Sequence, residues 1–193
     1  EGLISVDRTI KGKNENYQTP ERSIPEKQLD HPWESCITLS HSWGWVPDAK
    51  FKSPNEVVGL LAEITAKGGC LLLGVGPTPE GLIQPEVETC LRQVGKWLKT
   101  NGQAIYNTRI TSVYNDGKTW FTANKDGKTL YAIYTLADNE KLPATIEWEG
   151  NIPTGTMKLL NKNISVHYQC VGNKVKVTLP KGLAQEPLAF RFT

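Results

Sequence analysis

The segment between residues 6 and 45 holds most of the side chains that could do chemistry. Its ionisable and aromatic residues include Asp7, Arg8, Glu15, Glu21, Glu26, Asp30, His31, Trp33, Glu34, His41, Trp43 and Trp45. An aromatic ring can stack on the C–H face of a pyranose while carboxylates and a guanidinium bind its hydroxyls, so this mixture fits a carbohydrate site. The alternative is that the three tryptophans belong to the hydrophobic core.

Three short apolar runs could form the strands that position these side chains. Residues 3–6, 35–39 and 70–75 are rich in apolar and β-branched residues, as are strands buried on both faces of a parallel sheet. Asp7 and Arg8 follow the first run directly. In a parallel (β/α) barrel the active site lies at the carboxyl ends of the strands, so this position favours a functional role.

Two helical patterns accompany the second and third runs. The first has Ser53 and Glu56 at the spacing of a capping box and ends before Gly68-Gly69. The second begins at Pro85 and ends at Asn101-Gly102. The apolar positions expected to face the sheet are Val57, Leu60, Leu61 and Ile64 in the first helix and Val87, Leu91, Val94 and Leu98 in the second. Alternating strands and helices predict an α/β fold.

Beyond about residue 104 the sequence contains only strand and turn patterns. Turn signals occur at Asn115-Asp116-Gly117, Lys125-Asp126-Gly127, Glu149-Gly150-Asn151 and Val171-Gly172-Asn173. Runs such as 129–134 and 174–179 alternate apolar and polar residues between these turns, and a last strand covers 188–192. We therefore expect two domains, an α/β part over residues 1–103 and an antiparallel β-sandwich of about seven or eight strands over residues 104–193.

Composition argues against several classes of function. The chain has 193 residues and a formal net charge of +2 with scattered basic residues, so no nucleic-acid partner is expected. No apolar run is long enough for a membrane span. The four cysteines show neither CxxC pairs nor Cys/His ligand spacing, so we expect buried thiols, no metal site and no cofactor.

Several motifs follow one another in the first part of the chain. They are Val6-Asp7-Arg8, Glu15-Asn16-Tyr17-Gln18-Thr19-Pro20-Glu21, Pro32-Trp33-Glu34, Ser42-Trp43-Gly44, Ala66-Lys67-Gly68-Gly69, Gly76-Pro77 and Gly95-Lys96-Trp97-Leu98. In this order and spacing they resemble the C-terminal half of an α-L-fucosidase of glycoside hydrolase family 29. The resemblance implies the C-terminal part of a (β/α)8-like TIM barrel up to about residue 109, followed by a β-sandwich.

The resemblance also implies a reaction. Family members are retaining exo-acting hydrolases with an aspartate nucleophile and a separate acid/base carboxyl. The stretch that ends at Glu21 matches the one that supplies the acid/base, and Glu34 is the rival candidate. Because this acid must be protonated near neutral pH, we expect Glu21 to be buried near the nucleophile and its pKa to be raised.

Other residues match positions that contact the sugar. Trp43 matches an aromatic residue that packs on fucose, and Arg8 matches an arginine that could hold the site carboxylates. Glu34, Trp45 and His41 are further candidates for substrate binding. The family nucleophile lies on a strand before the Asp-Arg pair, so we interpret Asp7 as a partner of Arg8 and not as the nucleophile.

Two positions depart from the family pattern. Cys70 and Gly74 stand where the family typically has asparagine, which predicts altered hydrogen bonding near the mouth of the barrel. The loop of residues 15–21 resembles the subgroup that prefers branched α-1,3/1,4-fucosides.

The start of the chain suggests a missing segment. The sequence opens inside an apolar run and its only methionine is Met157, so we expect residues before Glu1. The expected partners are the N-terminal half of the barrel, from the same gene product, which carries the nucleophile, and a fucosylated oligosaccharide or glycoconjugate. The resemblance implies a periplasmic, secreted or lysosomal-type compartment. The alternative is a non-catalytic carbohydrate-binding fragment or a degenerate paralogue.

Overall fold

Parallel strands form the first part of the protein. The computed structural model describes residues 2, 4–8 and 15–193. The strands are β1 (Val6–Asp7), β2 (Tyr17–Gln18), β3 (Glu34–Thr38) and β4 (Cys70–Gly74). β1 pairs in parallel with β2, and β3 pairs in parallel with β4. Two single parallel bridges, Gln18 with Trp33 and Glu21 with Cys36, place β2 and the residues after it beside β3.

Helix α1 (Pro54–Ala66) connects β3 to β4 and begins where the sequence predicted. The Ser53 hydroxyl accepts a hydrogen bond from the amide of Glu56, and the Glu56 carboxylate accepts one from the amide of Ser53. The capping box therefore satisfies two donors that a helix N-terminus otherwise leaves free. Gly68 has a φ of 85°, which ends the helix and turns the chain into β4.

Helix α2 (Pro85–Asn101) follows β4 and has the predicted ends but a different buried face. The buried residues are Val87, Cys90, Val94, Trp97 and Asn101. Leu91, which we expected on this face, is exposed. The 87–90–94–97–101 spacing and the stripe through Leu91 both fit the helical period, so periodicity alone does not separate them, and packing in the shared core buries the face that carries Trp97. The short helix η1 (Gly102–Ala104) continues from α2.

Strand β4 is not buried on both faces as its apolar sequence predicted. Its residues are exposed or half-buried, and Leu72 is 50% exposed. Within the described part of the chain β3 is the only strand that pairs with β4, which leaves the other edge of β4 open. The apolar sequence therefore indicates a strand that can be buried. Whether β4 is buried depends on elements other than β3 that pack against it.

The second part consists of nine antiparallel strands in two sheets. Their bounds are β5 (Asn115–Asp116), β6 (Thr119–Ala123), β7 (Leu130–Tyr134), β8 (Thr145–Glu149), β9 (Lys158–Leu159), β10 (Ile164–Ser165), β11 (Tyr168–Val171), β12 (Lys174–Thr178) and β13 (Leu188–Phe192). The six-stranded sheet has the order β10-β9-β13-β7-β6-β5, and the three-stranded sheet has the order β11-β12-β8. Three of the nine strands have only two residues, which explains the excess over the predicted number.

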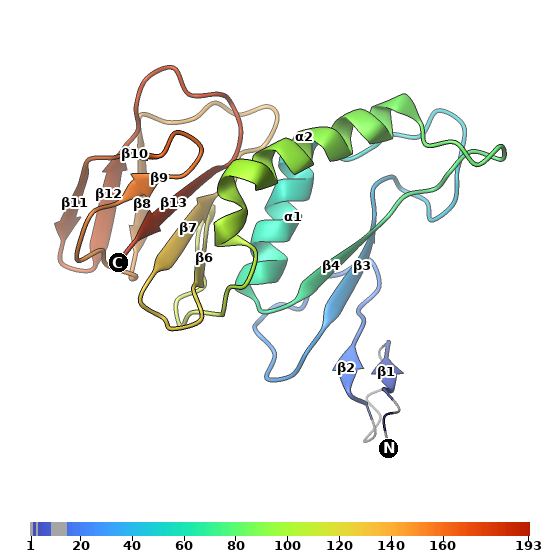
Figure 1. Ribbon diagram of the computed structural model, residues 1–193, viewed down its shortest axis with the longest axis horizontal. Coiled ribbons are helices and arrows are strands. Elements are labelled where there is room, and N and C mark those ends of the chain that lie inside the picture. The colour runs from blue at the N-terminus through green and yellow to red at the C-terminus, as the bar shows by residue number, and fades with distance from the viewer. Residues whose placement is uncertain (1, 3, 9–14) are drawn as a thin grey trace.

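The helices lie between the parallel strands and the antiparallel sheets (Figure 1). One core, with Phe121, Trp148 and Phe190, fills the sandwich. A second core joins residues of α1 and α2 to Ile133 and Ala189 of the six-stranded sheet. A mixed α/β part followed by antiparallel sheets confirms the predicted fold class.

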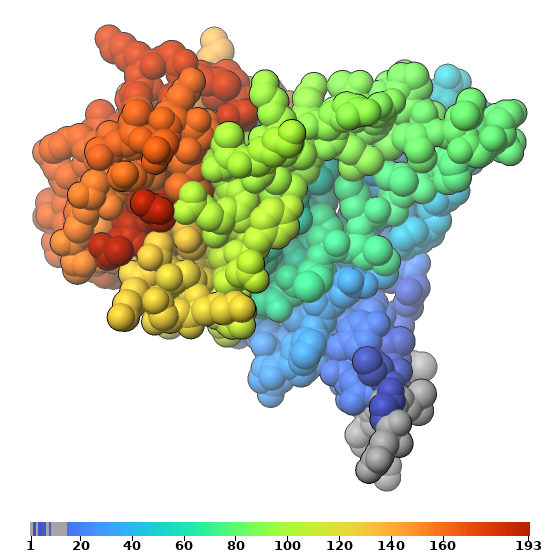
Figure 2. Space-filling view, in the orientation of Figure 1, coloured from blue at the N-terminus to red at the C-terminus, as the bar shows by residue number. Residues whose placement is uncertain are grey.

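In the space-filling view the described part of β1 and β2 protrudes from the remaining molecule (Figure 2). None of the helices in the described residues is both long and apolar enough to cross a membrane.

The cysteines differ from the expectation that all four are buried. Cys36 and Cys90 are buried, whereas Cys70 and Cys170 are exposed, and all four are free thiols. Cys70 lies at the start of the half-open β3–β4 pair, and Cys170 lies in β11 at an edge of the three-stranded sheet. Edge positions of this kind cannot be recognised from cysteine spacing alone.

Candidate active site

The candidate residues come together where the parallel strands end. Arg8 follows β1, Glu21 follows β2, and the loop with His41 and Trp43 follows β3. Parallel strands have their carboxyl ends at one edge, so these side chains belong to the same edge of the parallel strands. This is the edge at which sequence reasoning placed the site.

Arg8 and Glu21 form the central contact of this edge. The Arg8 guanidinium donates a hydrogen bond from Nη1 to Glu21 Oε2 at 2.6 Å. The Glu21 side chain is 39% exposed and the Arg8 side chain is 56% exposed. The expected proximity of the two residues is present, but Glu21 is exposed and not buried as expected.

The backbone around Glu21 is fixed by β3. Cys36 donates its amide to the carbonyl of Pro20 at 3.2 Å, and the amide of Arg22 donates to the carbonyl of Cys36 at 2.7 Å. Arg22 has a φ of 53°, a conformation that is uncommon for a residue with a side chain. Its guanidinium donates to the carbonyl of His41 at 3.1 Å and so links the Glu21 segment to the loop after β3.

Sequence reasoning missed Arg22. Neither its type nor its place directly after Glu21 distinguishes it from a surface arginine. Its left-handed backbone and its bond to a loop about twenty residues away depend on the pairing of β2 with β3. In the structure Arg22 links the segment of Glu21 to the loop that contains His41.

The segment after Glu21 is anchored on the side of the helices. Lys67 donates to the carbonyl of Pro25 at 2.7 Å and to the Glu63 carboxylate at 2.7 Å. Gln28 donates to the carbonyls of Ala66 at 2.9 Å and of Thr111 at 3.1 Å. Lys67 is buried, so these bonds are shielded from water and hold the segment firmly.

The loop after β3 has its own hydrogen-bond network. The Thr38 hydroxyl donates to the carbonyl of Ser40 at 2.5 Å, and the Lys52 ammonium donates to the carbonyl of Thr38 at 2.8 Å. The Ser40 hydroxyl accepts from the amide of Ser42 at 3.1 Å. These bonds set the path of the chain into Trp43.

Two of the three clustered tryptophans are exposed. Trp43 is 42% exposed and Trp45 is 38% exposed, whereas Trp33 is 3% exposed. Trp43 packs against the end of β4, where a Cβ added to Gly74 would lie 3.2 Å from its ring. The core interpretation is thus correct for Trp33, and the indoles of Trp43 and Trp45 present accessible faces.

Glu34 occupies a different place from Glu21. It begins β3 and pairs with Cys70 at the start of β4, so it lies toward the amino ends of the parallel strands. His31, near this end, makes a 2.7 Å contact with Asp30 through Nδ1, and that contact lowers the pKa of the Asp30 carboxyl. The side chain of Asp7 lies outside the described residues, so its expected contact with Arg8 has no test here.

The described residues include no group of three His, Cys, Asp or Glu side chains that could hold a metal ion. This edge offers the Glu21 carboxyl, the guanidinium groups of Arg8 and Arg22, and the two accessible indoles of Trp43 and Trp45. A carboxyl of this kind can exchange a proton with a ligand, and the indoles can stack on a sugar ring.

Comparison with known proteins connects this arrangement to one family. Residues 1–103 match the family model described as Alpha-L-fucosidase. Plasma alpha-L-fucosidase of Rattus norvegicus is 39% identical over 125 residues, which cover 61% of this chain and 27% of the relative. Alpha-L-fucosidase of Branchiostoma floridae is 33% identical over 172 residues, which cover 85% of this chain and 38% of the relative.

Solved structures agree over nearly the whole chain. Alpha-L-fucosidase isoenzyme 1 from Paenibacillus thiaminolyticus has a TM-score of 0.80 and 26% identity, covering 93% of this chain and 45% of that structure. The Thermotoga maritima alpha-fucosidase in complex with fucose has a TM-score of 0.78 and 25% identity, covering 97% of this chain and 44% of that structure.

The chain therefore belongs to the α-L-fucosidase family, glycoside hydrolase family 29. It spans less than half the length of the relatives and solved structures it matches.

Proposed function

We propose that this chain contributes the acid/base side of a retaining exo-α-L-fucosidase, with Glu21 as the acid/base. The observation that carries the proposal is the Arg8–Glu21 ion pair at the carboxyl ends of parallel strands. In this proposal residues 1–103 form the C-terminal portion of the catalytic barrel, and residues 104–193 form the appended sandwich.

The proposed reaction has two steps. In the first, protonated Glu21 gives its proton to the glycosidic oxygen as the C1–O bond breaks and a carboxylate nucleophile bonds to C1. In the second, ionised Glu21 takes a proton from water, which attacks C1 and releases fucose and the nucleophile. The nucleophile would come from the N-terminal barrel portion that we propose as the partner of this chain.

Closure by that portion would supply the environment that the exposed Glu21 lacks. Burial next to a second carboxylate favours the protonated form of an acid, whereas the Arg8 guanidinium favours the ionised form. We propose that Arg8 holds Glu21 in position and stabilises it after proton transfer. A solved family structure from Bacteroides thetaiotaomicron, described as a covalent intermediate trapped with a glutamate-to-glutamine variant, supports this two-step chemistry by analogy.

The substrate in this proposal is a terminal α-linked L-fucose on an oligosaccharide or glycoconjugate. Trp43 would stack on the sugar ring, with Trp45 and His41 along the side from which the aglycone leaves. Relatives are named plasma and tissue alpha-L-fucosidases, which supports a secreted or lysosomal-type compartment. Glu34 remains the rival acid/base, and its place toward the amino ends of the strands is the argument against it.

A paired substitution tests the proposal in the protein with its N-terminal barrel portion. Glu21→Gln should lower kcat/KM on a fucoside with a poor leaving group by about 10²- to 10⁴-fold, because no proton reaches the departing oxygen. Activity on an aryl fucoside with a good leaving group should fall much less at the first step. Added azide should restore turnover, because it attacks the fucosyl-enzyme without needing a base.

Glu34→Gln is the matched control, with the same chemical change thirteen positions further along the chain. It should leave the dependence on leaving group unaltered. If Glu34→Gln shows the leaving-group and azide signature and Glu21→Gln does not, the assignment of Glu21 is wrong.

The second candidate is sugar binding without hydrolysis by this chain. It is favoured by the exposure of Glu21 together with Trp43 and Trp45, which leaves a ligand surface without an enclosed acid. The isolated 193-residue chain should then quench or shift its tryptophan fluorescence with L-fucose and release no product from an aryl fucoside. Turnover by the isolated chain, abolished by Glu21→Gln, would contradict this alternative.

A further inference from the structure

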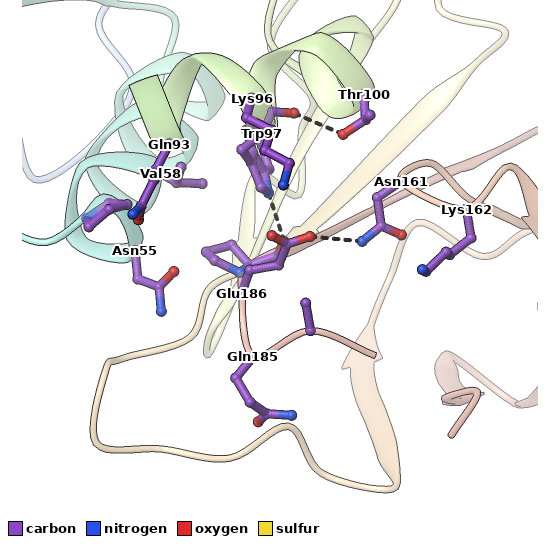
Figure 3. A pocket seen from close by; sticks show the side chains of 13 residues that line it. Asn55, Val58, Gln93, Lys96, Trp97, Thr100, Asn161, Lys162, Gln185 and Glu186 are labelled. Carbon is purple, nitrogen blue, oxygen red and sulfur yellow. Dashed lines mark hydrogen bonds between the residues drawn. The ribbon is translucent and has the colours of Figure 1, made fainter. Parts of the chain in front are cut away.

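A cleft lies on the other side of the helices from the parallel strands. It has a volume of about 530 Å³ and is lined by the first turns of α1, the outer face of α2, residues 161–162 and residues 184–187 before β13 (Figure 3). A space of this size accommodates about one or two sugar rings. None of the candidate active-site residues lines it.

The cleft has an apolar floor that is held rigidly. Val58, Trp97 and Pro187 are buried at its base. The Trp97 indole donates from Nε1 to the carbonyl of Pro187 at 2.7 Å, which fixes α2 against the loop before β13. A preformed apolar surface suits the C–H face of a pyranose because the ring can displace water there without any rearrangement.

The rim of the cleft is rich in side-chain amides. Asn55, Gln93, Asn161 and Gln185 come from four different segments and surround the same space (Figure 3). Asn55 and Gln93 each offer a carbonyl acceptor and an NH₂ donor, whereas the Gln185 carbonyl accepts a hydrogen bond from the amide of Leu142 at 2.8 Å. A sugar hydroxyl also donates and accepts, so this set matches a polyhydroxylated ligand from several directions.

Part of this hydrogen-bonding capacity is unused. Asn161 donates from Nδ2 to the Glu186 carboxylate at 3.0 Å, while its buried Oδ1 atom has no partner among the described residues. Among the side chains drawn in Figure 3, Asn55 and Gln93 take part in no hydrogen bond. The Asn161 Oδ1 atom is enclosed by protein, so the amides available to a ligand are those of Asn55 and Gln93.

The charges of the cleft narrow the ligand class. Lys96 and Lys162 lie at the rim, and the Glu186 carboxylate lies between the walls. An anion would be repelled by the Glu186 carboxylate and would give the amide carbonyls no hydrogen-bond donor. An apolar ligand would bury the amides without partners. We propose that this cleft is a binding site for a neutral oligosaccharide, separate from the site at the ends of the parallel strands.

The two sites are well separated. In Figure 1 the β1–β2 end and the loop that leads into β13 lie on opposite sides of the molecule. The proposal uses no property of Glu21 and therefore does not depend on the hydrolysis proposed above. Its consequence is that a glycan could be held by the cleft through a unit other than the terminal fucose.

Side-chain NMR of the 193-residue chain tests the proposal directly. N-acetyllactosamine, a neutral disaccharide without fucose, is titrated into the protein labelled with ¹⁵N. The side-chain amide signals of Asn55 and Gln93 and the indole N–H signal of Trp97 should move saturably. Gln93→Ala should weaken binding by roughly fivefold through loss of one hydrogen bond, while alanine preserves the helix.

Gln169→Ala, at an exposed position in β11, is the matched control and should bind as the unaltered chain does. Glu21→Gln should also leave the titration unchanged, which separates this proposal from the proposed hydrolysis. Inorganic sulfate is the second probe. If sulfate moves the same signals and the disaccharide does not, the cleft is an anion site and the proposal is overturned, as it is if neither probe moves them.

Discussion

The packing of the buried Trp33 indole requires glycine at position 69. A Cβ added at this position would lie 2.4 Å from the indole of Trp33, which is buried beneath the start of β4. Gly69→Ala should therefore destabilise the protein by about 2–3 kcal/mol, because the rigid ring must move in a closely packed site. Urea unfolding followed by circular dichroism measures the loss.

Gly95→Ala is the matched control for this substitution. Apart from neighbouring backbone of α2 itself, no atom lies within 4 Å of a Cβ built on Gly95, which sits inside α2. The same change should stabilise the protein here by about 0.5–1 kcal/mol, because alanine restricts the unfolded chain more than glycine does. Equal effects at the two positions would show that contact with Trp33 is not what makes Gly69 necessary.

Thiol reactivity should divide the four cysteines into two classes. Cys70 and Cys170 are exposed and should react rapidly with a disulfide reagent in the folded protein. Cys90 should react slowly, because burial, with a smaller effect of the Glu56 charge, raises the pKa of its thiol. Cys36 is buried and should also be protected. Mass spectrometry of the labelled peptides checks the assignment, and fast labelling of Cys90 would contradict it.

Residue types alone predicted the candidate site only in part. The sequence indicated Arg8 and Glu21 as neighbours, and the structure joins them. It could not separate buried Trp33 from exposed Trp43, because all three clustered tryptophans lie in similar sequence surroundings. Burial of Trp33 is decided by Gly69 and by Ile64 of α1, which come more than thirty residues later in the chain.

Among the elements, the pair β8–β12 carries a cross-strand ion pair with a predictable pH response. Glu147 lies directly opposite Lys176, 2.9 Å away, and the hydrogen bond from that ammonium lowers the pKa of the Glu147 carboxyl. The ion pair therefore stabilises the folded state above the ordinary pKa of glutamate, and this contribution is lost as pH falls through the lowered value.

Glu147→Gln should lower the urea midpoint slightly at about pH 7 and should not change it at about pH 2, where the carboxylate is protonated in both states. Glu149→Gln on the same strand is the control, because its carboxylate lies 3.8 Å from Lys174 and should matter less. If Glu147→Gln lowers the urea midpoint equally at both pH values, the loss of stability does not come from the ion pair.

Helices were easier to predict than the burial of strands. The start of α1 is set by Ser53, Pro54 and Glu56, which act within one turn and can be read from the sequence. The exposure of Leu91 and of β4 depends on which other elements pack against them. Local signals therefore located these elements, and tertiary contacts decided which faces are covered.

At the scale of the whole molecule, the core shared by the helices and the six-stranded sheet should make them unfold together. Ile133 of β7 is completely buried in this core with Val57 and Val94 of the helices. Ile133→Val should reduce the protection of α1 and α2 amides against hydrogen exchange by about 1 kcal/mol, although the change lies in the sheet. Unchanged protection in the helices would show that the two parts open independently.

The boundary expected near residue 103 marks a change of pattern along the chain. Helices give way to strands there, and the division into two domains at this point stays a prediction. The contacts that cross it, such as the bond from Trp97 to Pro187, join positions ninety residues apart and have no local signal.

Strand β13 faces two different interiors at once. Leu188, Phe190 and Phe192 fill the space between the sheets, and Ala189 faces the helices. A slip of one residue would force a phenylalanine into a space shaped for a methyl group and leave a void where the ring had been. The alternation of large and small side chains therefore fixes the register of β13 against β7 and β9, because only one alignment fills both interiors.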